Sequence, residues 1–263
     1  MLARLMKYEI KSTARLFIPL YAVLLIFALL NRFLNPFETL EAAESFSIQI
    51  LLRGLSIGAY FFLIIAVFVI TLVIIIQRFY KNLLGDEGYL MFTLPMKPWQ
   101  HIANKLLTAI LWCVFSVTVI TGSFFILFDS GQIFEFLTYL KDSIKQTFGT
   151  AGFLVLPTLV IAQLTAGLMM LYNAMALGQL FQKNRLLASF GMYCALYSIQ
   201  QVIYVICLLL LANTSFLSLI RTGAPAPWDM NLFLGTLAIS GFLLAAAHFV
   251  VVNYVLNTKL NLD

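Results

Sequence analysis

His248 is the one histidine within the long charge-free stretches of this chain, and its surroundings limit the chemistry that it can perform. An imidazole in such a stretch can relay protons, but no Asp, Glu, Lys or Arg lies beside it to exchange them. A lone histidine that follows Ala245, Ala246 and Ala247 is more typical of a hydrogen bond between two helices. The sequence also lacks an HExxH pair, so it offers no machinery for a metal-dependent hydrolase.

Side-chain amides recur in the same stretches as His248. Amides buried among apolar helices usually join one helix to another, and they also suit a path for an amphipathic substrate. Both interpretations stay open from the sequence. The candidate substrate-path residues are Gln163, Asn173, Gln179, Gln200, Gln201 and His248.

The composition shows which solvent must surround these residues. The chain is 62% hydrophobic and only 10% charged, with a mean hydropathy of +0.97, which is far more apolar than a soluble domain. Lipid is therefore the expected solvent. The net charge of +5 does not indicate nucleic-acid binding, because the basic residues flank apolar runs and form no dense patch. Cys113, Cys194 and Cys207 lie within apolar runs without metal-ligand spacing, which indicates packing residues.

Stretches without charge locate the membrane spans, since a spanning helix needs about 20 mostly apolar residues. We predict an all-α membrane protein in which residues 1–263 form a single transmembrane domain of six transmembrane helices. The predicted spans are residues 16–34, 54–77, 106–128, 153–181, 186–212 and 231–256.

Six spans put both termini on one side, and the basic residues indicate which side. Eleven Lys and Arg residues lie on the side of the termini and five on the opposite side. The positive-inside rule therefore predicts that the N- and C-termini face the cytoplasm. Residues 129–150 then lie outside, and Ile133, Leu137, Leu140 and Ile144 give this loop the periodicity of an amphipathic helix.

Residues 1–15 are too polar to span a membrane. At about 100° per residue, Leu5, Met6 and Ile10 fall on one side of a helix, while Lys7 and Lys11 fall on the other. This pattern predicts an interfacial amphipathic elbow helix that leads into the first span.

The segment of residues 78–105 is a polar interruption between the second and third spans, and the charge rule places it in the cytoplasm. Adjacent acids lie between Gly85 and Gly88, and Pro95 follows. We expect the second span to continue as helix beyond Tyr80 and to stop at Gly85. A short second helix with an acidic start and exposed aromatic residues would follow, ended by Pro95 and Pro98, which is a suitable element for docking a protein.

The run DEGYLMFTLPMKPWQHIANK (residues 86–105), with the basic helix ahead of six spans, resembles the permease subunit of an ABC transporter of the type-2 exporter family, in the style of Gram-positive bacteria. Members have an acid-Gly element, a Leu-Pro or Ser-Pro step, and a lysine that opens the third span; Lys105 matches the last. The chain departs from larger relatives in having no sizeable outer domain. The resemblance implies an ATPase-coupling segment that includes Asp86, Glu87, Gly88, Tyr89, Phe92, Thr93, Leu94 and Pro95.

The resemblance also implies partners. The chain has no Walker A phosphate-binding loop, so it is not expected to be an enzyme, and ATP and Mg would be bound by a separate ABC ATPase subunit in two copies. A second permease, identical or related, and membrane lipid complete the assembly in a bacterial plasma membrane. The expected cargo is hydrophobic or amphipathic, such as a peptide or an antibiotic. The alternative is a non-transporting membrane scaffold or sensor that binds a cytoplasmic partner.

Overall fold

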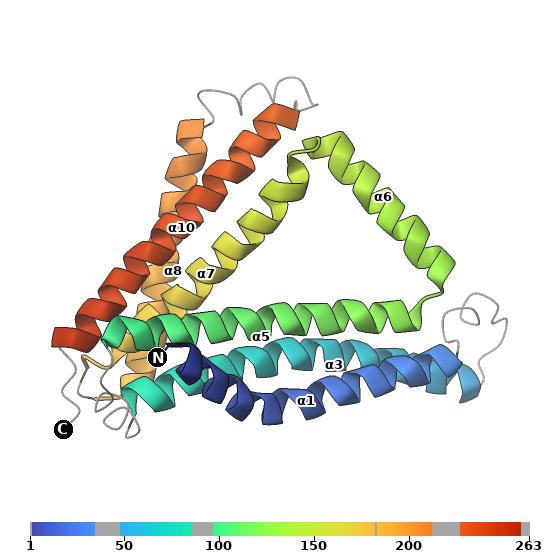
Figure 1. The fold of residues 1–263 in the computed structure, drawn as a ribbon, viewed down its shortest axis with the longest axis horizontal. Helices are drawn as coiled ribbons and strands as arrows, with labels where there is room; N and C mark the ends of the chain where they lie inside the picture. The colour runs from blue at the N-terminus through green and yellow to red at the C-terminus, as the bar shows by residue number, and fades with distance from the viewer. Residues whose placement is uncertain (1, 35–47, 86–96, 182, 212–226, 259–263) are drawn as a thin grey trace. The chain divides into compact units, whose positions relative to one another are not determined.

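The computed structural model describes residues 2–34, 48–85, 97–181, 183–211 and 227–258, and within these ranges the chain is helical, with no strand. Figure 1 shows the described helices as coiled ribbons. They are α1 (Leu2–Leu34), α3 (Ile48–Phe79), α5 (Pro98–Leu127), α6 (Ser130–Phe148), α7 (Gly152–Gly178), α8 (Arg185–Leu211) and α10 (Pro227–Thr258). A π-helical turn, η1 (Tyr80–Leu84), follows α3 directly. The predicted all-α class is confirmed.

Six of the described helices are long and apolar enough to cross a membrane. The stretches are Arg4–Leu34, Leu51–Leu84, Pro98–Leu127, Gly152–Gly178, Arg185–Cys207 and Met230–Thr258. The prediction of six spans is therefore confirmed by helix length and hydropathy, and the chain is a multi-pass membrane protein.

The helices α3 and α5 each begin before the predicted span and include the cation that ends the charge-free stretch. The predicted second span begins at residue 54, whereas α3 begins at Ile48 and contains Arg53. The predicted third span begins at residue 106, whereas α5 begins at Pro98 and contains Lys105. A cation ends a charge-free stretch but does not end a helix, because a long basic side chain can reach the interface or a buried polar partner.

The predicted elbow helix is not separate from the first span, because α1 runs from Leu2 to Leu34 without a break. The two predicted faces of its N-terminal part are present: Thr13 is buried and Ile10 is half-buried, while Lys7 and Lys11 are exposed. The ribbon of α1 changes direction along its length (Figure 1). Pro19 lies inside the helix and has no N–H to donate to the preceding turn, and a proline at such a position bends a helix.

The helix predicted within residues 129–150 is confirmed as α6, and a glycine ends it. Gly149 adopts a φ of 66°, in the left-handed region where glycine is favoured. Its N–H donates to the Lys145 carbonyl at 3.0 Å, which satisfies one of the last carbonyls of α6. This turn separates α6 from α7 by only a few residues.

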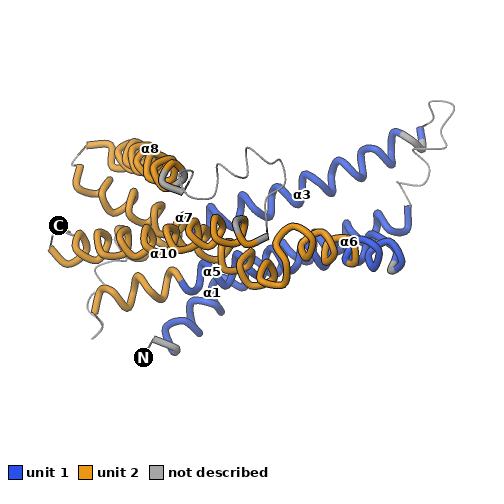
Figure 2. The backbone as a smooth tube through the Cα atoms, turned by 90° about the horizontal axis from the view of Figure 1, so that it is seen from above, with its two compact units in different colours: residues 1–75, 107–137 blue, residues 76–106, 138–263 orange. Residues whose placement is uncertain are grey.

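The chain divides into two compact units, coloured separately in Figure 2. Unit 1 comprises residues 1–75 and 107–137, and unit 2 comprises residues 76–106 and 138–263. The boundaries fall inside α3, α5 and α6, so each of these helices contributes one end to each unit. The ends of α3 and α5 that flank residues 86–96 belong to unit 2, together with α7, α8 and α10.

Unit 1 is held by an aromatic and aliphatic core that short polar side chains tie together. Phe17 stacks on Trp112 with ring centroids 4.2 Å apart, and the Trp112 indole N–H donates to Thr13 Oγ1 at 2.8 Å. Ser116 Oγ lies 2.8 Å from the Tyr21 hydroxyl and 2.9 Å from Thr71 Oγ1, so one serine joins α1, α3 and α5. Such bonds hold helices together in lipid, where apolar contacts alone give little preference for one neighbour.

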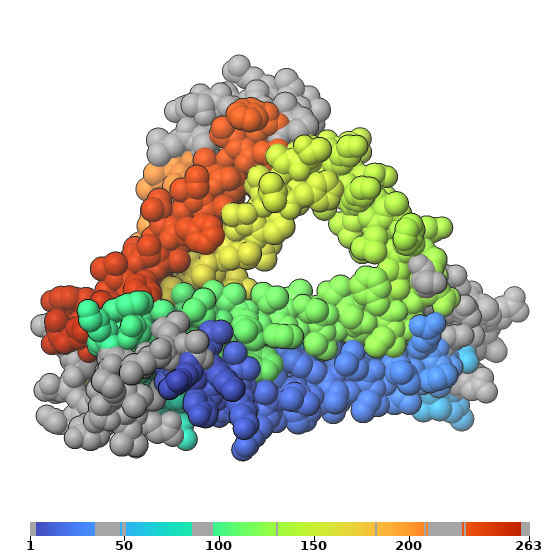
Figure 3. All heavy atoms as spheres, viewed as in Figure 1, coloured from blue at the N-terminus to red at the C-terminus, as the bar shows by residue number. Residues whose placement is uncertain are grey.

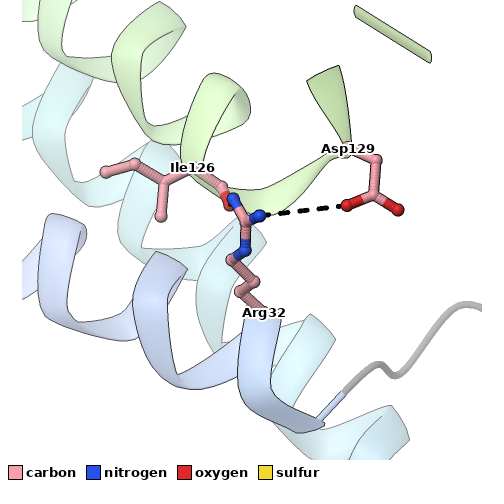
Figure 4. Close-up of polar contacts among 3 residues, drawn as sticks. All are labelled: Arg32, Ile126 and Asp129. Atoms are coloured by element: carbon pink, nitrogen blue, oxygen red, sulfur yellow. Dashed lines mark hydrogen bonds and ion pairs between the residues drawn. The ribbon is translucent and has the colours of Figure 1, made fainter. Parts of the chain in front are cut away.

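Arg32 satisfies the end of a neighbouring helix in unit 1. Its guanidinium donates to the Ile126 carbonyl at 3.0 Å and lies 3.9 Å from the Asp129 carboxylate (Figure 4). Ile126 belongs to the last turn of α5, where carbonyl groups lack helical partners and a positive charge is favourable. The Arg32–Asp129 pair is exposed, so we assign it a positioning role rather than a large stabilisation.

In unit 2, α7 packs most extensively on α10, and the two lie side by side in Figures 1 and 3. One set of buried positions on each of the two helices recurs at alternating spacings of three and four, as in coiled coils. We refer to these positions as the α7–α10 seam: Ala162, Ala166, Met169, Asn173 and Ala176 on α7, with Ala238, Gly241, Ala245, His248 and Val252 on α10. Most of them are small, which allows the helix backbones to approach closely.

Candidate functional site

The residues predicted to couple to an ATPase lie outside the described residues. They are Asp86, Glu87, Gly88, Tyr89, Phe92, Thr93, Leu94 and Pro95. The helix ends on both sides of them are described, and both ends belong to unit 2.

The α3 end continues as helix up to Leu84, as predicted, and its last turn is π-helical. The wider turn of η1 leaves both Leu83 and Leu84 buried. Gly85 then takes an extended conformation (φ −97°, ψ −170°). A Cβ at Gly85 would lie 3.0 Å from the Lys81 carbonyl oxygen, so a close approach of the backbone favours glycine here, rather than a left-handed turn.

The α5 end begins at Pro98, which corrects the expectation that this proline ends a helix. Proline suits the first helical position, because its missing N–H would have no helical partner there. Gln100 Oε1 accepts from the Lys97 N–H at 3.2 Å, and the Gln100 N–H donates to the Lys97 carbonyl at 2.9 Å. This reciprocal pair resembles a capping box, so α5 starts at a position that its own sequence defines.

Four residues join the end of α3 with η1 and the start of α5 to α7. Because α3 and α5 form a helical hairpin in the sequence, we name these residues the hairpin-base cluster: Phe79, Asn82, Lys105 and Tyr172. Phe79 and Tyr172 are 0% and 1% exposed and stack with ring centroids 3.9 Å apart and an interplanar angle of 7°. The Tyr172 hydroxyl donates to the Lys105 carbonyl at 3.4 Å. With its amide oxygen turned toward Lys105, Asn82 accepts from Lys105 Nζ at 3.1 Å and donates to the Arg78 carbonyl at 3.2 Å.

Lys105 was expected at re-entry into the membrane, and it is buried inside the protein, with 4% of its surface exposed. His101 and Asn104 of the same helix are buried beside it in sequence. Positions 101, 104 and 105 lie on one helix face. The first turns of α5 therefore present a buried polar face. An apolar face would hold the helix in place at less cost, so these polar residues set this end of α5 apart.

Among the candidate substrate-path residues, Asn173 and His248 meet at the α7–α10 seam. Asn173 Nδ2 lies 2.8 Å from His248 Nδ1, so the imidazole is a hydrogen-bond partner between two helices, as the sequence favoured. Asn173 Oδ1 and His248 Nε2 are buried and have no partner among the described residues. One donor and one acceptor thus remain at this point of the seam, assuming the tautomer that this bond implies.

Gln163 and Gln200 belong to a second, separate network. Tyr204 of α8 donates to Gln163 Oε1 at 2.7 Å and lies 3.2 Å from Gln200 Nε2. Gln163 Nε2 donates to the Leu237 carbonyl of α10 at 3.1 Å. This network joins α7, α8 and α10, and Tyr204 was not identified from the sequence, because its partner lies 41 residues away.

The remaining two candidates do not join either network. Gln201 is exposed on α8, beside Gln200 in sequence but on another face of the helix. Gln179 follows the end of α7, and its Nε2 is buried without a partner among the described residues. Four of the six candidates therefore belong to hydrogen-bonded groups that join helices, and a substrate path along any of the six stays a prediction.

A serine motif of the hydrolase type occurs at residues 54–58, which read GLSIG and match the G-x-S-x-G pattern. In an esterase this serine occupies a sharp turn between a strand and a helix. Here the motif lies inside α3, and Ser56 Oγ donates to Asn31 Oδ1 at 2.9 Å. Ser56 therefore joins α3 to α1 and is not presented as a nucleophile.

No group of three or more His, Cys, Asp or Glu side chains in the described ranges is arranged to hold a metal ion. Searches with this chain find no matching family model, no matching curated protein and no matching solved structure.

Proposed function

We propose that the chain is the membrane-spanning permease subunit of an ATP-driven ABC exporter and that residues 78–105 couple it to a separate ATPase. The observation that carries the proposal is the form of this segment. Two membrane-length helices, α3 with η1 and α5, extend past the apolar stretches and flank residues 86–96, which contain Asp86 and Glu87. A polar segment held at the ends of two long helices suits the binding of a soluble motor.

The charge distribution supports a cytoplasmic position for this segment. Within unit 2, the end of α3 and the start of α5 meet α7 at Tyr172, near the C-terminal end of α7. Arg78, Lys81, Lys183 and Arg185 follow or precede the spans at these ends. Clustered basic residues at the ends of spans favour the cytoplasmic side, which supports cytoplasmic termini and the N-terminal part of α1 as an interfacial segment.

The complete exporter would contain two ATPase subunits with ATP and Mg, and a second permease, identical or related, in a bacterial plasma membrane. The cargo would be hydrophobic or amphipathic, such as a peptide or an antibiotic. The sequence of the predicted spans supports this class, because residues 54–77, 106–128, 153–181, 186–212 and 231–256 contain no Asp, Glu, Lys or Arg.

The coupling role is tested by charge reversal. Glu87→Lys, and separately the replacement of residues 85–94 with Gly and Ser, should abolish copurification with the ATPase, or reduce it at least about tenfold, because the docking contact would lose its acid and its apolar surface. Asp142→Lys, an equal charge reversal on exposed α6, is the matched control and should copurify normally. Normal recovery of the ATPase with both loop variants would refute the docking role.

A scaffold or sensor that binds a cytoplasmic partner through the same segment is the second candidate, and the networks that join α7, α8 and α10 are equally compatible with a static bundle. The two functions differ in their response to nucleotide. In lipid vesicles that contain the chain and its copurified partner, an exporter predicts ATP hydrolysis that responds to exported compound, whereas a scaffold predicts a constant rate.

A further inference from the structure

The hairpin-base cluster connects the segment of residues 86–96 to helices far from it in the sequence. We propose that this cluster is a rigid joint, with Tyr172 as its central positioning residue, through which displacement of the ends of residues 86–96 passes to α7 and then to α10. The role of the joint in transport rests on the proposed function, whereas its rigidity can be measured on the chain alone.

The first part of the joint links α3 to α7. The nearly parallel Phe79 and Tyr172 rings lie 3.9 Å apart and are fully buried, so neither ring can tilt without displacing the other. Phe79 is the last residue of α3 and directly precedes η1. A shift of the α3 end is therefore delivered to α7 at one defined point.

The second part links α5 to both α3 and α7. Lys105 contributes its Nζ to Asn82 and its carbonyl to the Tyr172 hydroxyl, so one residue contacts η1 and α7 at once. A buried ammonium group leaves its polar partners only at a large free-energy cost. The two helix ends that flank residues 86–96 are thus held to each other and to α7.

The third part links α7 to α10 through the next residue in the chain. Tyr172 and Asn173 are consecutive, and successive side chains of a helix lie about 100° apart, so one faces the hairpin base while the other faces the seam. Asn173 bonds to His248, and Ala174, Met175 and Ala176 are also buried. This part of α7 is enclosed and cannot yield locally.

All of these contacts lie in unit 2, to which residues 76–106 belong together with α7 and α10. The division of α3 between two units is a second observation in favour of the joint. The end of α3 next to residue 86 belongs to the unit that contains the α7–α10 seam, and not to the unit that contains the rest of α3. Transmission needs such contiguous packed elements, and coupling measurements decide whether they carry it.

The first experiment measures the joint without any partner. Hydrogen–deuterium exchange is followed in lipid nanodiscs for the native chain and for Tyr172→Leu, at the amides of residues 245–252. The joint predicts that Tyr172→Leu raises exchange there by roughly 2- to 30-fold. Tyr193→Leu, which removes a stack of rings 6.3 Å apart within α8, is the control and should leave this region unchanged.

Two further variants keep the test decisive if Tyr172→Leu does not fold. Tyr172→Phe retains the stack but loses the bond to the Lys105 carbonyl, so it should raise exchange at residues 245–252 less than Tyr172→Leu does. Asn82→Ala removes the η1 contact with Lys105 and should also raise exchange there. Asn257→Ala is its control, because among the described residues the Asn257 amide bonds to Asn253 of the same helix. Unchanged exchange at residues 245–252 in both Tyr172→Leu and Asn82→Ala would overturn the joint.

The second experiment separates the joint from the proposed function. MgATP is added to the complex with its copurified ATPase, and exchange at residues 245–252 is compared before and after. A functional joint predicts a nucleotide-dependent change in the native complex that Tyr172→Leu abolishes and Tyr193→Leu retains. A nucleotide-dependent change that persists in Tyr172→Leu overturns the joint and leaves the exporter standing. If the native complex shows no change although Tyr172→Leu raises exchange in the chain alone, the exporter is overturned and the joint stands.

Discussion

Polar side chains within the spans of this protein join one helix to another through single hydrogen bonds. Asn173 with His248, and Gln163 with Tyr204, each join two helices of unit 2. The sequence identified the amides and the histidine, because polar residues are conspicuous in apolar stretches. It could not identify which of them pair, or that Tyr204 is a partner of Gln163, since Tyr204 looks like an ordinary interfacial aromatic residue until distant helices meet.

The Asn173–His248 contact gives a measurable energy at the residue scale. A double-mutant cycle with Asn173→Ala and His248→Ala should show a coupling of about 0.5–2 kcal/mol, the range of hydrogen bonds between membrane helices. Unfolding of the purified protein in mixed detergent measures it. A second cycle that pairs Asn173→Ala with the exposed Asn257→Ala is the control, and equal energies in the two cycles would contradict a specific bond.

At the scale of the helices, the sequence predicted their number better than their ends. Charge-free length finds every span, but it stops at Arg53 and Lys105, which the helices include. The ends depend on contacts that a local pattern does not contain, such as the Lys105 bond to Asn82. The continuity of α1 was missed for a similar reason, because polarity alone does not interrupt a helix.

The close approach of α7 and α8 provides a prediction at this scale. A Cβ on Gly178 would lie 2.6 Å from Ser189 Cα, whereas a Cβ on Gly167 in the same helix would meet nothing within 4 Å. Gly178→Ala should therefore destabilise the protein by about 1–3 kcal/mol, as overpacking does, and Gly167→Ala should not. Thermal unfolding in detergent compares the two variants, and equal melting temperatures would show that α8 can move away freely.

For the whole molecule, the composition was sufficient to predict the class of protein, because an apolar content of 62% has one common explanation. The orientation in the membrane remains a prediction from basic residues. The segment with the most specific sequence, residues 86–96, lies outside the described structure, so its docking role is a matter for experiment.

The predicted orientation can be tested on intact cells. In a background without Cys113, Cys194 and Cys207, a cysteine at position 141 of α6 should react with a membrane-impermeant maleimide added outside. A cysteine at position 257, near the end of α10, should react only after the membrane is permeabilised. Both positions are exposed, so accessibility reports the side of the membrane and not burial. The reverse pattern would place residues 78–105 outside and exclude coupling to a cytoplasmic motor.

The burial of α7 changes along its length, and this has a consequence for its membrane surroundings. Leu154 and Val160 in its first turns are 76% and 62% exposed, whereas Met169 to Ala176 are almost completely enclosed. The first turns of α7 therefore offer more side-chain surface to surrounding lipid or to a second permease than the turns around Tyr172 do.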